Sequence, residues 1–238
     1  MGRLIRLQLR NILHSKVFYV CLVFTAILTP ILGLIAYREL NLEGDLTVCA
    51  QIIDIFKSEP TLMAQIFIAL MFCMDFNEGT TKNIIARGYS NMQLFVSKCI
   101  TVIISLFGIY LLTALVNFVI YFKEGMGFND TFLMFMIYGI VSIITMTIFY
   151  GAISYILEKN GIAIIAVLFA PNIIGSILGI ISDKINIPFS DYWLTYVGGE
   201  FLVTPTWINL ILPVVVFMLY ILFILVGTSF ILKKKEIK

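Results

Sequence analysis

The chain has 238 residues, of which 61% are hydrophobic and 13% are charged, and its formal net charge is +2. A soluble domain contains about 45–50% apolar and about 25% charged residues, so this composition excludes a water-soluble fold and indicates a membrane protein. The small net charge gives no indication of nucleic-acid binding. The four cysteines form no C-x-x-C pair and His14 is the only histidine, so neither a histidine-based metal centre nor a catalytic triad is expected.

Residues 1–16 predict an amphipathic helix that lies in the membrane interface. One helical face is basic, because cationic side chains recur at spacings of three and four residues: Arg3, Arg6, Arg10 and His14. Another face is largely apolar, with Ile5, Leu9, Ile12 and Leu13. This pattern is typical of a helix whose basic face meets lipid phosphates. The apolar run that follows is too long for a cleaved signal peptide, so we expect an anchor on membrane lipid.

Six segments without Asp, Glu, Lys or Arg predict six transmembrane helices, because a helix needs about 20 apolar residues to cross the hydrocarbon core. The segment 61–74 is shorter than that and requires extra turns at its ends. Backbone groups in lipid must be bonded within their own segment, which favours helices. The predicted spans of this single membrane domain, residues 1–238, are 17–37, 59–76, 95–122, 131–157, 161–182 and 207–232.

The distribution of Lys and Arg predicts that both termini are cytoplasmic. With six spans, twelve of the sixteen basic residues fall on the side of the N-terminus. An excess of Lys and Arg marks the cytoplasmic side of a membrane protein. We therefore expect a multi-pass protein of a cell membrane, with the loop between spans two and three in the cytoplasm.

That loop, residues 77–92, predicts a short amphipathic helix. Asn77 or Thr80 can cap its start, and Gly88 allows a turn or the close approach of another backbone. Apolar residues recur at helical spacing after the cap: Ile84 or Ile85, Tyr89 and Met92. On physical grounds alone, a solvated loop with one capped helical turn accounts for the pattern better than a docking helix does.

The connection between spans five and six, residues 183–206, is rich in aromatic residues. Trp193 lies within it and Trp207 follows directly, and these are the two tryptophans of the chain. Aromatic rings with polar atoms settle at the membrane–water interface. Short re-entrant or interfacial helices at the outer surface explain this segment, and an ordinary aromatic belt explains it equally well.

Residues 75–98 contain a motif of an acidic residue, Gly-Thr, a basic residue, an apolar pair, Gly-x-Ser and a later Lys. The residues that carry it are Asp75, Gly79, Thr80, Lys82, Asn83, Gly88, Ser90 and Lys98. This motif resembles the first cytoplasmic loop of ABC-2 type permeases, although Asn91 stands where that family commonly has Arg. The layout of the whole chain is also similar, and its length is most similar to permeases of Gram-positive exporters that act on small amphipathic peptides.

The resemblance implies that residues 77–92 form a coupling helix that docks on a separate ATPase subunit. Its implied contact and loop-shaping residues are Glu78, Gly79, Thr80, Lys82, Asn83, Arg87, Gly88 and Tyr89. It also implies two permease copies, identical or related, that export bacteriocin-type or toxin-type peptides across a bacterial plasma membrane. The chain has no G-x-x-x-x-G-K-[ST] loop, so ATP and Mg²⁺ are expected on the ATPase subunit, and this chain is expected to be no enzyme and to hold no cofactor.

Polar and small residues within the predicted spans are candidates for a substrate path at the dimer interface. Asn117 and Asn172 are the strongest polar residues there, and Pro171 loosens its helix. Gly175 and Gly179 form a G-x-x-x-G pair, which allows close helix approach. For each of these residues, a bond to neighbouring backbone or packing within one subunit is the simpler explanation.

Three other functions compete with export of peptides. An ABC exporter of small drugs or lipids fits the same pattern. A membrane enzyme acting on lipid-soluble substrates would need paired carboxylates or a histidine near the interface. The only acidic residues near the aromatic segment are Asp183, Asp191 and Glu200, and a catalytic role for them is not expected. An ion-coupled carrier usually buries a charged side chain in its spans. All 16 basic and 14 acidic residues lie outside the six uncharged segments, which argues against a carrier.

Overall fold

The computed structural model describes residues 1–40, 59–77, 79–121, 130–185 and 206–236, together with positions 187, 190–194, 196, 197, 201 and 204. The elements within these residues are all helical, and no strand occurs among them. The prediction of an all-α protein is therefore confirmed for this part of the chain. Glu78, which is one of the predicted coupling residues, lies outside the described residues.

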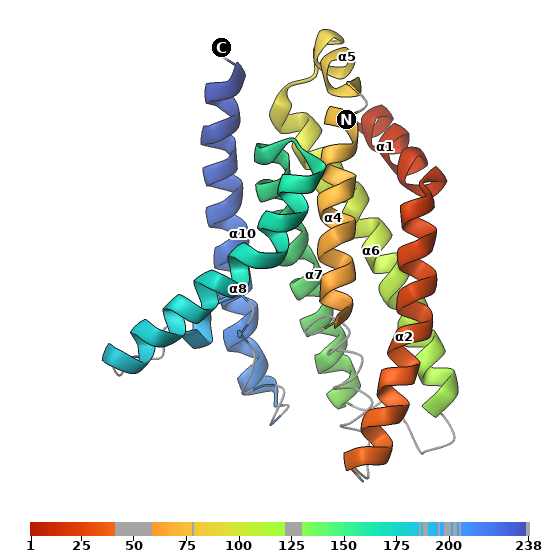
Figure 1. Cartoon of the computed structure of the whole chain (residues 1–238), viewed down its shortest axis with the longest axis vertical. Helices are drawn as coiled ribbons and strands as arrows, with labels where there is room; N and C mark the ends of the chain where they lie inside the picture. The colour runs from red at the N-terminus through yellow and green to blue at the C-terminus, as the bar shows by residue number, and fades with distance from the viewer. Residues whose placement is uncertain are drawn as a thin grey trace.

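The helices follow one another along the chain and most of them run roughly parallel to the long axis (Figure 1). Their bounds are α1 Gly2–His14, α2 Lys16–Leu40, α4 Glu59–Asn77, α5 Thr80–Ala86, α6 Asn91–Tyr121, α7 Asp130–Leu157, α8 Asn160–Ile185, the 3-10 helix η2 Ser190–Tyr192 and α10 Trp207–Glu236. The longest six overlap the predicted spans, and α6 begins at Asn91, ahead of the predicted residue 95.

Within the described residues, four helices are long and apolar enough to cross a membrane. They are Asn91–Leu112, Met136–Leu157, Asn160–Ile185 and Trp207–Lys234. The apolar stretches of α2 and α4 within the described side chains, Lys16–Ile27 and Met63–Phe76, are shorter. A membrane-spanning helix needs about 20 residues, so the long apolar helices are compatible with a multi-pass membrane protein.

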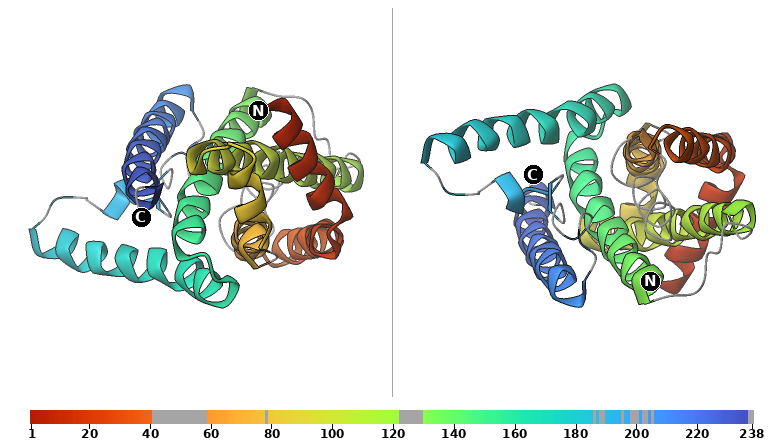
Figure 2. Two further views of the ribbon diagram at one scale, coloured as in Figure 1. Left: turned by 90° about the horizontal axis from the view of Figure 1, so that it is seen from above. Right: turned by 90° about the horizontal axis from the view of Figure 1, so that it is seen from below.

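Helix α7 is central in the bundle, because it packs against α4, α6, α8 and α10. In the membrane-length stretches of α6 and α7, 61% and 56% of the residues are buried, whereas only 17% are buried in those of α8 and α10. Figure 2 shows α8 projecting away from the other helices. The exposed side chains of α8 and α10 are mainly apolar, as expected for surfaces that face lipid or a partner.

Two glycines allow neighbouring helices to approach α7 closely. A Cβ atom at Gly151 would lie 2.5 Å from the Phe72 ring of α4, and one at Gly139 would lie 2.7 Å from the Tyr110 hydroxyl of α6. Side chains at these positions would therefore overlap with buried aromatic residues. Interiors are packed too densely to absorb such an overlap without moving a helix.

Trp193, which lies between α8 and α10 in the sequence, packs against the middle of α8. The Trp193 indole nitrogen donates to the Pro171 carbonyl at 2.9 Å, and the ring makes edge contacts with Phe149 and Tyr220. Pro171 lies about 21 Å from the end of α8, at about 1.5 Å of rise per residue. Short helices were expected in residues 183–206, and the structure has the three-residue 3-10 helix η2 there, directly before Trp193.

Both described ends of the chain lie at the same end of the molecule as α1 and α5 (Figure 1). We call this the α5 end. The helices α4 and α6 both reach it, and α5 connects them there. This end of the bundle contains the strongest polar interactions among the described residues.

Candidate functional site

A buried ion pair lies at the α5 end, between the last turns of α4 and the first turns of α6. The Lys98 ammonium is 3.1 Å from the Asp75 carboxylate, and the two side chains are 1% and 5% exposed. The same ammonium donates to the carbonyls of Met71 at 3.2 Å and Phe72 at 2.7 Å. It also lies 5.8 Å from the centre of the Phe76 ring. Lys98 is therefore fixed to the end of α4 by charge and by hydrogen bonds.

The Asp75 carboxylate brings four helices together. Gln8 of α1 donates its amide to one carboxylate oxygen at 2.9 Å. Thr80, the first residue of α5, donates its hydroxyl to the other oxygen at 3.1 Å, with the Asp75 backbone carbonyl at 3.2 Å from the same hydroxyl. We call Gln8, Asp75, Thr80 and Lys98 the Asp75 cluster. One side chain thus connects α1, α4, α5 and α6.

Aromatic rings pack beside the Asp75 cluster. The rings of Phe76 and Tyr155 have centres 5.0 Å apart, and Phe95 lies 5.5 Å from Tyr155 and 5.8 Å from Phe72. The ion pair is buried, and the low dielectric constant of a buried site strengthens the interaction between its charges. It also makes the loss of either charge costly, because the remaining charge stays buried without its counterion.

Helix α5 stands on the Asp75 cluster and exposes one side. Gly79 precedes it with a φ of +68°, a conformation that glycine adopts without strain. Thr81 and Ile84 are buried against the protein. Lys82, Asn83, Ile85 and Arg87 are exposed. The helix is therefore held on one face and open on the other.

The structure changes three details of the predicted coupling helix. It covers Thr80–Ala86 only, and the chain turns through Gly88, whose φ is +89°. Tyr89 therefore lies beyond the helix, with its side chain half-buried. The Thr80 hydroxyl caps no backbone N–H, because it donates to the Asp75 carboxylate.

The motif residue Ser90 begins the next helix. The backbone N–H of Gln93 donates to the Ser90 hydroxyl at 3.2 Å, and the Ser90 N–H donates to the Gln93 side chain at 3.1 Å. This reciprocal arrangement is a capping box. It explains why α6 begins at Asn91, ahead of the predicted span, and it places Lys98 in the second turn, facing Asp75.

The described contacts of the residues predicted for a substrate path involve no predicted coupling residue. Asn172 donates to the Leu168 carbonyl of its own helix at 2.8 Å, which is the simpler of the two explanations considered. Gly175 is covered by Trp193 and Tyr196, since an added Cβ would lie 3.0 Å from each ring. Pro171 accepts the hydrogen bond from Trp193.

The contacts of the structure do not decide the roles of the other two residues predicted for the substrate path, Gly179 and Asn117. An added Cβ at Gly179 would meet nothing within 4 Å, so only this glycine of the G-x-x-x-G pair can admit another helix. Asn117 belongs to α6, and its side chain lies outside the described residues.

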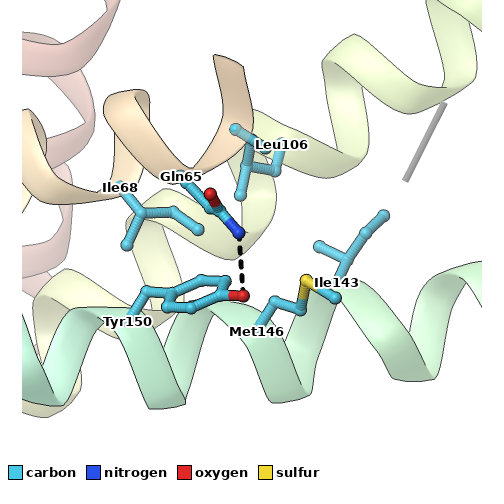
Figure 3. A pocket seen from close by; sticks show the side chains of 7 residues that line it. Gln65, Ile68, Leu106, Ile143, Met146 and Tyr150 are labelled. Carbon is cyan, nitrogen blue, oxygen red and sulfur yellow. Dashed lines mark hydrogen bonds between the residues drawn. The ribbon is translucent and has the colours of Figure 1, made fainter. Parts of the chain in front are cut away.

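A second polar pair lies deep in the bundle (Figure 3). Gln65 of α4 donates its amide to the Tyr150 hydroxyl of α7 at 2.8 Å, and both side chains are buried. A small cavity beside them has room for about one water molecule. Its other lining residues are apolar: Ala64, Ile68, Leu106, Ile143 and Met146. A cavity of this size and lining suits helix packing and no larger ligand.

Asp75 and Lys98 belong to the sequence motif, whereas no sequence pattern points to Gln8, Gln65 or Tyr150. A signal for the ion pair was present, because the two opposite charges end consecutive apolar segments on the same predicted side of the membrane. Asp75 and Lys98 lie outside the uncharged segments, as the sequence shows, but α4 and α6 extend beyond these segments and bury one charge each. The absence of charge from the uncharged segments therefore does not mean that the helices bury no charge.

In comparisons with known proteins, no protein-family model, no curated protein and no solved structure matches this chain. The features of the chain that bear on its function are its membrane-length apolar helices and the Asp75 cluster beneath α5.

Proposed function

We propose that this chain is the membrane-spanning permease subunit of an ATP-driven ABC exporter, with six spans and both termini cytoplasmic. It works as a dimer, with a separate ATPase subunit for each copy, and expels amphipathic peptides. The observation that carries this proposal is the placement of α5, a short exposed helix fixed at its base to two long helices and to α1 through the Asp75 cluster.

The attachment of α5 suits the transmission of force. A displacement of α5 acts on Thr80, and through Asp75 it acts on α4, α6 and α1 together. A flexible tether would absorb such a movement. Packed elements linked by buried hydrogen bonds move as units instead, which is how a small shift at a docking site becomes a helix movement.

The open face of α5 suits a soluble partner. Lys82 and Arg87 provide two cations, Asn83 provides an amide, and Ile85 is 41% exposed. An exposed apolar side chain among charges is the composition of a helix that docks in a groove. Both described chain ends lie at the same end as α5, which agrees with the cytoplasmic termini expected from the Lys and Arg distribution (Figure 1).

The buried Asp75 carboxylate supports a second candidate, an ion-coupled carrier. Buried acidic residues in membrane helices often relay protons or bind cations. Asp75 is, however, paired with Lys98 and bonded by Gln8 and Thr80, and no other acidic side chain is buried among the described residues. A proton or cation relay needs several titratable groups in succession. The Asp75–Lys98 pair is therefore better suited to holding helices together than to conducting an ion.

The deciding experiment is reconstitution of the chain with the ATPase subunit that co-purifies with it. We expect ATP hydrolysis that amphipathic peptides stimulate, tested side by side with small drugs and lipids. Stimulation by drugs or lipids alone would change the substrate class. A chain that purifies without an ATPase and transports on an ion gradient without ATP would establish the carrier instead.

A further inference from the structure

Helix α1 has a packed face and, opposite it, a basic face. Leu4, Gln8 and Ile12 are buried and hold the helix on the bundle, where it packs mainly against α6. At about 100° per residue, Arg3, Arg6 and Arg10 lie on the opposite face. All three arginines are exposed. The packing of α1 therefore directs its basic face away from the protein.

The basic face has no acidic residue of its own segment to neutralise it. Residues 1–38 contain no Asp or Glu, and Lys16, which is exposed, adds a further cation directly after α1. Leu13 is 42% exposed on the flank between the packed face and the basic face. A helix with exposed cations on one side and exposed apolar residues beside them is suited to the headgroup layer of a membrane.

Helix α2, which follows α1 directly after Ser15, carries an apolar groove. The groove is lined by five exposed side chains: Tyr19, Val20, Val23, Phe24 and Ile27. Lys16 lies on the same face of α2, because positions 19, 20, 23 and 27 follow it at three, four, seven and eleven residues. A cation therefore stands at the head of an apolar groove that runs along the helix from the α5 end. Figure 2 places α1 and α2 together at one edge of the bundle.

We propose that the basic face of α1, Lys16 and the α2 groove together bind an anionic phospholipid. The acyl chain lies along the α2 groove, and the phosphate meets Lys16 and the basic face of α1. The cations complement the charge of an anionic headgroup. They precede the apolar groove along the chain, as a lipid headgroup precedes its acyl chain. Each cation near an anionic bilayer surface contributes roughly a fivefold gain in association. The proposal does not depend on the exporter function.

The test uses the full chain in phosphatidylcholine bilayers that contain trace spin-labelled phosphatidylglycerol or phosphatidylcholine. The wild-type protein is expected to immobilise the phosphatidylglycerol probe preferentially, and the preference is expected to fall as salt is raised. The variant R6Q/R10Q/K16Q is expected to reduce the preference at least about twofold. The matched variant R6K/R10K/K16R, which keeps all three charges, is expected to retain it.

A second control distinguishes binding at this site from general attraction between the anionic lipid and the positive charges of the protein. The variant K233Q/K234Q removes two exposed cations from α10 at the same end of the molecule. It is expected to leave most of the preference intact. The proposal is overturned if R6Q/R10Q/K16Q keeps the wild-type preference, if the charge-retaining variant loses as much, or if K233Q/K234Q removes the preference equally.

Discussion

The Lys98 ammonium and the Asp75 carboxylate are 3.1 Å apart in a place where neither side chain is more than 5% exposed. The pair fixes the start of α6 to the end of α4, and Asp75 also holds the first residue of α5. A buried pair of this kind is weak as a source of stability, but removing one partner leaves an uncompensated charge. Its position beneath α5 makes it the joint through which we expect movement to pass.

The first prediction concerns this pair. Lys98→Met leaves Asp75 buried without its counterion and should destabilise the protein by about 3–5 kcal/mol. The double variant Asp75→Asn, Lys98→Met removes both charges and should recover much of that loss. Unfolding in mixed detergent, followed by circular dichroism, measures both. The single variant Asp75→Asn completes the comparison. If the loss of stability in the double variant equalled the sum of the losses in the two single variants, Asp75 and Lys98 would not be coupled, which would contradict the prediction.

The second prediction concerns the attachment of α5. Thr80→Val keeps the shape of the side chain and removes the hydroxyl that donates to Asp75, which should weaken the anchoring of α5 by about 1.5 kcal/mol. Faster amide hydrogen exchange in residues 80–86 is the expected readout. Thr80→Ser keeps the hydroxyl and should exchange like the wild-type protein. Equal exchange in all three proteins would show that packing of Thr81 and Ile84 alone holds α5.

The third prediction concerns the open face of α5. Lys82→Glu with Arg87→Glu should weaken association with the proposed ATPase subunit at least about tenfold while membrane insertion is unchanged, because charge reversal at an interface creates repulsion. Co-purification of the two subunits measures association. Lys233→Glu with Lys234→Glu reverses two charges at the same end of the molecule and is expected to leave association intact. Normal association of the α5 variant would place the contact elsewhere.

The fourth prediction concerns helix packing. Gly151→Ala puts a methyl group 2.5 Å from the buried Phe72 ring and should cost about 1–3 kcal/mol in the free energy of unfolding. Gly179→Ala adds a methyl group that meets nothing within 4 Å and should leave the stability of one subunit unchanged. If Gly179→Ala nevertheless weakened association between two copies, this glycine would lie at the dimer contact.

Local pattern determined the class and outline of the protein. The uncharged stretches gave the positions of the long helices because burial in lipid depends mainly on composition over about 20 residues. Helix α7, Asp130–Leu157, begins and ends within one residue of the predicted span 131–157. The short helix between spans two and three was also visible, although Gly88 ends it early and Ser90 starts the next one.

The tertiary structure alone decided which residues meet. Gln8, Asp75 and Lys98 are far apart in the sequence, and nothing in their local periodicity predicts one buried cluster. The same holds for Gly175, which a local motif assigned to helix association and which Trp193 covers from another segment. Composition indicates whether a segment can cross a membrane, because crossing requires about 20 predominantly apolar residues whatever their partners are. The partner of a buried charge, or the ring that covers a glycine, depends on how distant helices pack.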